Sequence, residues 1–193
     1  MSTPNALEQK HPFALIIIDV INHYKFKEES HLLEYTKKMA GPLKKLKERA
    51  KEQKVPVIYV NDHYYMWQAD YHKIIDHCKN EENQEILETL SPAEDDFFLI
   101  KPKHSAFYES ALHTLLRQLH VKNIIVTGVA GNISVLFTAN EGYMKEYTIY
   151  APADCIASNT KEANEFALNM MKNVLGADLT ESSELTFTEP KEK

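Results

Sequence analysis

The segment Ile124–Tyr143 reads IIVTGVAGNISVLFTANEGY, and it decides the fold. It opens with a β-branched apolar run, turns at Thr127 and Gly128, and then places apolar residues at helical spacing. These apolar residues are Ile133, Leu136, Phe137 and Met144. The pattern predicts a buried strand, a tight turn and a helix that holds Ser134 in its first turn. Such a turn directs backbone N–H groups of the helix start into a cleft, where a developing anion would be stabilised.

Apolar runs and amphipathic patterns alternate along the rest of the chain. Continuous apolar runs predict four further strands, at residues 13–18, 55–60, 97–100 and 147–150. Helical spacing predicts helices at residues 32–53, 112–119 and 159–175, the last with Phe166, Met170 and Val174 facing inward. Residues 64–79 are rich in aromatic side chains and histidine, and we expect them to wrap around the cleft without forming a plain helix.

This alternation fixes the fold class. Strands that alternate with helices indicate βαβ units with right-handed crossovers and a parallel sheet. We therefore predict an α/β fold, a three-layer α/β/α sandwich with a mainly parallel, Rossmann-like sheet of about six strands. We expect one domain over residues 1–193, with residues 1–11 and 186–193 flexible.

Composition narrows the class of protein. The chain has 193 residues, of which 44% are hydrophobic and 26% charged, and its net charge of -6 argues against a nucleic-acid partner. No apolar run is long enough to cross a membrane, and the first residues lack the apolar core of a signal peptide. Cys78 and Cys155 fit neither a disulfide framework nor a metal spacing. We therefore expect a reduced, cytoplasmic protein that has no cofactor and binds neither nucleic acid nor membrane.

Two of the predicted strands end in a charged side chain. Asp19 follows the run at residues 13–18, and Lys101 follows the run at residues 97–100. The carboxyl ends of parallel strands share one edge of a sheet, and ligands bind there. Asp19, Lys101 and Ser134 can therefore meet in one cleft, although Asp19 could equally start a turn or cap a helix.

Three segments together resemble the isochorismatase-like cysteine hydrolases. TGVAGNISVLFTA is similar to the family signature T-G-V-A-x-N-I-C-V-x-x-T-A, and IIIDVINHY is similar to the segment I-I-D-M-x-N-D-F. IKPKHSAF is similar to the segment in which a lysine precedes an aromatic-containing loop. The resemblance covers about residues 13–185. It departs from the family at Ser134, where the family has its nucleophilic cysteine, and at His23, where the family has an aspartate.

The resemblance implies hydrolysis of a C–N bond, of amide, ureido or lactam-like type, in a small molecule. Asp19 would take the proton of the nucleophile, Lys101 would balance the charge, and the side chain at position 134 would attack a carbonyl. The backbone N–H groups of Ala130 and Ser134 would form the oxyanion hole, and a cis peptide bond would join Val129 to Ala130. The family also implies a homo-oligomer, a dimer or larger.

Ser134 leaves the mechanism open. A thiol ionises near pH 8.5, whereas a serine hydroxyl is far more basic and normally needs a positioned histidine. His23 and His104 could lie nearby, but neither matches a catalytic position of the family. Three explanations remain: an engineered Cys-to-Ser change that traps a ligand, a natural relative that binds without hydrolysing, and a member with other chemistry. The last could be vinyl-ether hydrolysis with Asp19 as general acid, as in the isochorismatases proper.

Four side chains are predicted to line the substrate pocket, namely His23, Trp67, His104 and Phe107. Trp67 belongs to an aromatic stretch, residues 64–71, which could hold a planar substrate. The same stretch could equally be ordinary packing or a contact between subunits, because aromatic residues are enriched at interfaces.

A histidine-rich cluster raises the question of a metal. Nicotinamidases of this superfamily hold a divalent metal through an Asp-x-His motif and further histidines, but here Asp62 and His63 are adjacent. His72 and His77 are five residues apart, off the i, i+4 spacing that places side chains on one helix face. We therefore predict no metal site and interpret these histidines as solvated or cleft-lining. Cys155 is interpreted as a packing residue.

Overall fold

The computed structural model describes residues 10–26 and 30–188, and its strands form one sheet in which every pairing is parallel. The order along the sheet is β3-β2-β1-β4-β5, and β6 also pairs with β4. The strands are β1 (Phe13–Ile18), β2 (Val57–Asp62), β3 (Phe97–Lys101), β4 (Asn123–Val129), β5 (Thr148–Tyr150) and β6 (Ile156–Ala157). The predicted parallel sheet of about six strands is confirmed.

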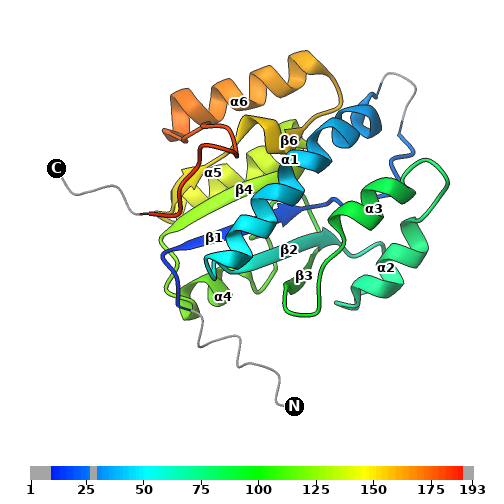
Figure 1. Cartoon of the computed structure of the whole chain (residues 1–193), viewed down its shortest axis with the longest axis horizontal. Coiled ribbons are helices and arrows are strands. Elements are labelled where there is room, and N and C mark those ends of the chain that lie inside the picture. Colours follow the sequence, from blue (N-terminus) through cyan, green and yellow to red (C-terminus); the bar gives the residue numbers. More distant parts are fainter. Residues whose placement is uncertain (1–9, 27–29, 189–193) are drawn as a thin grey trace.

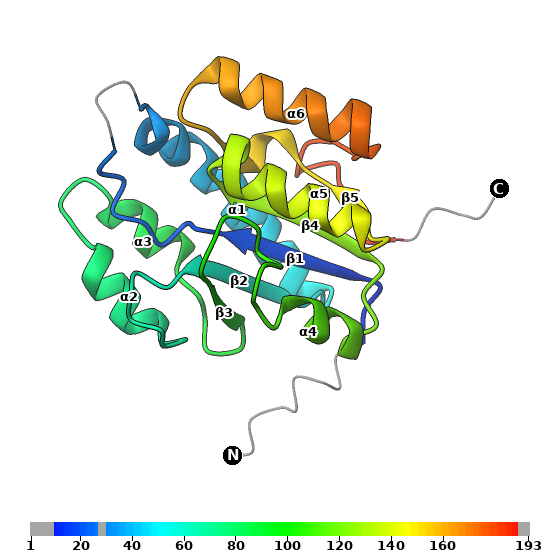
Figure 2. The same cartoon turned by 180° about the vertical axis from the view of Figure 1, so that it is seen from behind.

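Helices cover both faces of this sheet. Figure 1 shows α1 crossing one face, with α2 and α3 beside it, and Figure 2 shows α4 and α5 on the opposite face with α6 beyond them. The helices are α1 (Leu32–Glu52), α2 (Tyr71–Cys78), α3 (Gln84–Leu90), α4 (Leu112–Gln118), α5 (Leu136–Met144) and α6 (Lys161–Leu175). In the described part of the chain, no helix combines the length and the apolar character that a bilayer span requires.

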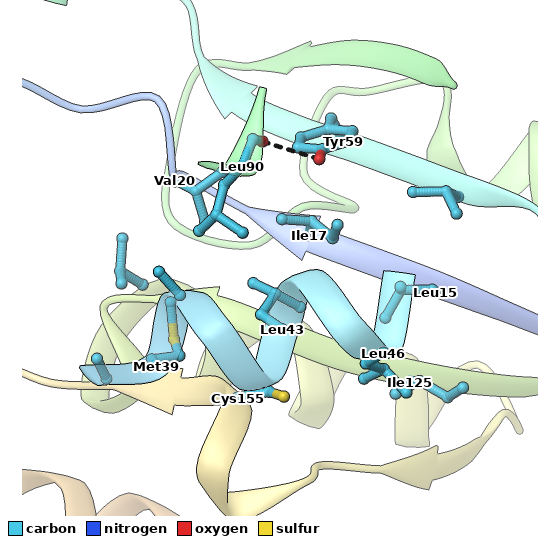
Figure 3. Packing of buried hydrophobic residues seen from close by; sticks show 14 of the residues in the cluster. Leu15, Ile17, Val20, Met39, Leu43, Leu46, Tyr59, Leu90, Ile125 and Cys155 are labelled. Carbon is cyan, nitrogen blue, oxygen red and sulfur yellow. Dashed lines mark hydrogen bonds between the residues drawn. The ribbon is translucent and has the colours of Figure 1, made fainter. Parts of the chain in front are cut away.

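The central strand β1 is buried along its whole length. Its odd-numbered residues, including Leu15 and Ile17, belong to the hydrophobic cluster beneath α1, and its even-numbered residues belong to the cluster on the other face. Figure 3 shows Leu43 of α1 pointing toward Ile17 of β1. Alternate side chains of a strand point to opposite faces, so a strand covered on both faces is apolar throughout. This is the pattern that the sequence of residues 13–18 predicted.

Gly128 lets β1 and β4 approach at the carboxyl edge of the sheet. Its φ is +106°, and a Cβ atom added there would lie 2.2 Å from the carbonyl oxygen of Ile18. We expect Gly128→Ala to lower the free energy of unfolding by at least about 3 kcal/mol, because it adds backbone strain to a clash that rigid strand backbone cannot relieve. Urea unfolding followed by circular dichroism measures the loss.

Gly41 offers a matched control for this substitution. It lies exposed in α1, and a Cβ added there meets nothing within 4 Å. Alanine is favoured over glycine in a helix, so Gly41→Ala should stabilise the protein by up to about 1 kcal/mol. Equal unfolding free energies for the two variants would contradict the role given to Gly128.

Two segments differ from the sequence prediction in their extent. Strand β2 is shifted by two residues from the predicted 55–60: it begins at Val57, and Asn61 and Asp62 continue the ladder with β3. The segment at residues 64–79 contains the helix α2, contrary to the expectation of a wrapping, non-helical segment. The carboxylate of Asp70 accepts a hydrogen bond from the Lys73 N–H at 3.2 Å and so caps this helix.

The inward faces of α5 and α6 also differ from the prediction. Phe137 and Met144 are 52% and 65% exposed, while the small residues of α5 face the sheet. Gly142 makes this possible, since a Cβ there would lie 2.7 Å from Ile124 Cδ1. On α6 the buried residues are Ala167, Met171 and Leu175, one position after the predicted Phe166, Met170 and Val174, which are exposed. Five large apolar side chains therefore lie on the surface of these two helices, namely Phe137, Met144, Phe166, Met170 and Val174.

Candidate active site

A charged pair lies at the carboxyl edge of the sheet. Asp19 directly follows β1 with a φ of +51°, and Lys101 is the last residue of β3. The Lys101 Nζ lies 2.8 Å from Asp19 Oδ2, and the lysine side chain is only 2% exposed. Strand β2 lies between β1 and β3, so the pair of Asp19 and Lys101 spans the end of β2. There the Asp62 N–H donates a hydrogen bond to Asp19 Oδ1 at 2.9 Å. The Lys101 ammonium also donates to the carbonyl of Lys103 at 3.1 Å.

The third predicted residue sits on a turn between β4 and α5. Residues Gly131–Val135 form a π-helical turn, in which the Val135 N–H donates to the Ala130 carbonyl at 3.2 Å. Such wide single turns occur frequently at functional sites. Ser134 is 6% exposed within this turn, and the peptide bond between Val129 and Ala130 is cis, as the resemblance implies.

Asp19, Lys101 and Ser134 line one pocket of about 770 Å³. A volume of this size suits a small organic molecule. Ala130 and Ile133 also line this pocket, so the turn between β4 and α5 contributes to its wall beside Ser134. The sequence therefore identified residues from three separate segments that the fold brings together. Their catalytic roles, and the oxyanion hole at Ala130 and Ser134, stay predictions.

The four predicted pocket-lining residues divide into two pairs. His23 and His104 line the pocket. Trp67 does not, because it is 65% exposed and stacks on His63 with ring centroids 4.0 Å apart. Phe107 does not either, since it is 5% exposed in the core and stacks on Tyr147. The predictions for Trp67 and Phe107 are thus wrong.

His23 is held at the pocket wall beside two aromatic rings. Its ring lies 5.7 Å from the ring of Phe26 and 5.9 Å from that of Tyr64. Partial burial, reinforced by the nearby His77 and Lys25, lowers the pKa of His23. His23 is therefore neutral at neutral pH, and because its Nδ1 accepts from the Lys25 N–H at 2.9 Å, its Nε2 carries the proton and can donate a hydrogen bond.

Buried asparagines fix the loop that carries His23, and nothing in the sequence beyond their polarity indicates this role. Asn61 Oδ1 accepts from the Ile21 N–H at 3.1 Å, and its Nδ2 donates to the Ile21 carbonyl at 3.0 Å. Asn83 Nδ2 donates to the Asn22 carbonyl at 2.8 Å. These bonds satisfy backbone groups of a loop that has no secondary structure of its own. They link residues at least 40 apart in sequence, so no local pattern could reveal them.

The histidine cluster does not form a metal site. Within residues 10–26 and 30–188, no three histidine, cysteine or carboxylate side chains are grouped so that they could hold an ion. Asp62 Oδ1 accepts from the Tyr64 N–H at 2.7 Å, and His63 Nδ1 accepts from the Tyr65 N–H at 2.9 Å. His77 packs against the ring of Tyr64. The local backbone thus engages one donor atom of Asp62 and one of His63, and without three grouped ligands in the described residues this cluster does not fit a metal site.

Neither native cysteine competes with Ser134 for the role of nucleophile. Cys78 and Cys155 are both free and buried, and neither lines the pocket. Burial raises the pKa of Cys78 to about 11 and that of Cys155 to about 12. Both therefore remain protonated at neutral pH, as the prediction of a packing role for Cys155 requires.

Comparison with known proteins bears on this arrangement. The family model described as Isochorismatase domain matches residues 13–184. The uncharacterized isochorismatase family protein YaaI of Bacillus subtilis (strain 168) is 53% identical over 172 residues, which cover 89% of this chain and 95% of that protein.

Solved structures show the same fold. An N-carbamoylsarcosine amidase from Thermoplasma acidophilum superimposes with a TM-score of 0.71 at 25% identity, covering 90% of this chain and 98% of that one. A nicotinamidase from Staphylococcus aureus gives a TM-score of 0.67 at 22% identity, covering 89% and 98% of the two chains. With the domain match and the sheet-edge pocket, these similarities show that this chain belongs to the isochorismatase-like hydrolase family.

Proposed function

We propose that this protein binds a small molecule with an amide, ureido or lactam-like C–N bond in the pocket at the carboxyl edge of its sheet. We further propose that the site is that of an amidohydrolase whose nucleophile position holds Ser134. The observation that carries the proposal is the shared pocket of Asp19, Lys101 and Ser134. The amidase and nicotinamidase among the structural neighbours support the choice of bond.

The charged pair suits a thiol better than a hydroxyl. In the proposed reaction the Asp19 carboxylate removes the nucleophile's proton, and the Lys101 ammonium, 2.8 Å away, stabilises the nearby negative charge. Attack on the substrate carbonyl forms a tetrahedral oxyanion, and the C–N bond breaks as the nitrogen takes the proton that Asp19 removed. Water, deprotonated by Asp19, then attacks the acyl-enzyme, which releases the carboxylic acid and returns the proton to the nucleophile. A carboxylate is far too weak a base for a serine hydroxyl near neutral pH. We therefore expect the Ser134 protein to bind its ligand and to hydrolyse it slowly or not at all.

The ion pair argues against the vinyl-ether alternative. A general acid must hold a proton, whereas the contact between Asp19 Oδ2 and Lys101 Nζ uses an ionised carboxylate. A binding protein that has lost catalysis is the stronger second candidate, because serine places a small polar side chain at position 134 without supplying a reactive thiol.

Binding of small amides by the Ser134 protein tests the proposal. Calorimetric titration with a panel of nicotinamide, ureido acids and small lactams should find at least one that binds. Ser134→Leu, which adds bulk at the pocket wall, should weaken that binding at least tenfold, because a filled site cannot accommodate the ligand. Trp67→Ala is the control, since Trp67 lies outside the pocket and its loss should leave affinity unchanged. A panel without any binder, or equal binding by Ser134→Leu, would overturn the proposal.

A further inference from the structure

The geometry points to Thr138 as a positioning residue that ties the turn carrying Ser134 to the loop that follows Lys101. Its hydroxyl donates to the Ser134 carbonyl at 2.7 Å and accepts from the Ala106 N–H at 2.9 Å. This inference rests on the proposed function, since it gives Thr138 the task of holding the nucleophile position against the charged pair. Thr138 is part of α5 and does not touch the pocket itself.

Both ends of this link are buried. Thr138 and Ala106 are each 0% exposed, so water cannot replace either hydrogen bond. A buried N–H group without an acceptor is costly, and the Ala106 N–H has the Thr138 hydroxyl as its acceptor. A hydroxyl can donate one bond and accept others at once, which is what a bridge between two backbone groups needs. Valine has the same shape as threonine, but its side chain can neither donate nor accept a hydrogen bond.

The two segments that the hydroxyl joins each carry one part of the site. The π-helical turn carries Ser134, and its carbonyl is one end of the bridge. The loop begins at Lys101, whose ammonium contacts Asp19, and it reaches Ala106 five residues later. Sub-ångström placement of a nucleophile affects rate steeply. The two hydrogen bonds of the Thr138 hydroxyl therefore hold the nucleophile position and the ammonium at one separation.

Thiol reactivity at position 134 tests this role without any knowledge of the substrate. In a Ser134→Cys background, adding Thr138→Val should lower the rate of alkylation by iodoacetamide about tenfold and move its pH profile to higher pH, because the thiolate loses its fixed position near Lys101. Thr138→Ser keeps the hydroxyl and should restore both the rate and the pH profile.

Thr36 supplies the matched control. It is 0% exposed, and its hydroxyl donates to the Leu32 carbonyl at 2.7 Å in α1, four residues back, as that of Thr138 does in α5. Thr36→Val should lower stability to a similar extent and leave alkylation at position 134 unchanged. Should Thr138→Val not fold, Thr138→Ala removes the same hydroxyl with less bulk, and the expected loss of rate is the same.

The outcomes separate the two proposals. If the thiol introduced by Ser134→Cys reacts no faster than Cys78 and Cys155, both the proposed function and the role of Thr138 are overturned. If the introduced thiol is reactive but Thr138→Val matches Thr36→Val, the proposed function stands and the positioning role is overturned. If Thr138→Val lowers the alkylation rate and Thr138→Ser does not restore it, the positioning role is also overturned, because the effect then does not come from the hydroxyl.

Discussion

Ser134→Cys is expected to convert this protein into an amidase of readily measured activity, with kcat/KM at least about a thousandfold above that of the Ser134 protein. The reason is chemical. A thiol ionises near pH 8.5, and beside the Lys101 ammonium its thiolate is further favoured. The proposed oxyanion donors are the backbone N–H groups of Ala130 and Ser134, so the change should leave them in place, and one such donor stabilises a transition state by roughly 3–4 kcal/mol.

Two assays measure this expected gain. The first follows ammonia or amine release from the panel of small amides, with Ser134→Ala as the variant that lacks any nucleophile. The second follows labelling by iodoacetamide at about pH 8, where the introduced thiol should be labelled first. Cys78 and Cys155 act as internal controls, because their pKa values of about 11 and about 12 keep them protonated. An inert Ser134→Cys variant whose new thiol is no more reactive than these two would show that position 134 is not a nucleophile position.

In the Ser134→Cys background, Asp19→Asn should lower the amidase activity about 10²–10⁴-fold. An amide cannot accept the thiol proton, so the general base is lost. The substitution also leaves the Lys101 ammonium buried without its partner, since the lysine side chain is 2% exposed. Breaking a buried pair in this way should destabilise the protein by about 3–5 kcal/mol. The amidase activity and the free energy of unfolding measured in urea should therefore both fall.

Two further variants separate catalysis from stability. Asp154→Asn alters a carboxylate that accepts from the backbone and hydroxyl of Ser182 outside the pocket, so it should lower stability and leave activity intact. Combining Asp19→Asn with Lys101→Met removes both partners, which should recover much of the stability but none of the activity. If the combined variant regains activity, Asp19 acts only through folding.

Much of the fold can be predicted from the sequence because burial on both faces makes a strand uniformly apolar. Residues 13–18 could be recognised as a central strand for this reason. Which face of α5 and of α6 packs on the sheet could not be predicted, because that depends on how closely each helix approaches the sheet. The absence of a side chain at Gly142 allows α5 to lie against Ile124, and this turns Phe137 and Met144 outward. Helical periodicity identifies an apolar face of a helix, but it does not show which face packs against the sheet.

The candidate site, like the fold, could be predicted from the sequence only in part. Asp19 and Lys101 could be predicted because each directly follows an apolar run, and parallel strands share their carboxyl edge. Trp67 and Phe107 were misplaced, since an aromatic residue near a strand end can point to solvent, pocket or core with equal ease. The family signature matches Thr138 to a threonine, but the resemblance gives that residue no role, so the bridge through Thr138 could not be predicted. Its hydroxyl meets a backbone group 32 residues away in sequence, and a threonine inside a helix is ordinary.

The sheet order has a consequence for how the chain folds as it is synthesised. The central strand β1 lies between β2 and β4, and the pairing of Phe13 with Asn123 joins residues from opposite halves of the chain. At roughly 5–20 residues per second, the ribosome releases β4 roughly 5–20 s after β1. During that interval one edge of the most apolar strand is unpaired, and such edges promote aggregation. A nascent chain stalled before residue 123 should therefore depend on chaperones far more than one released after residue 129.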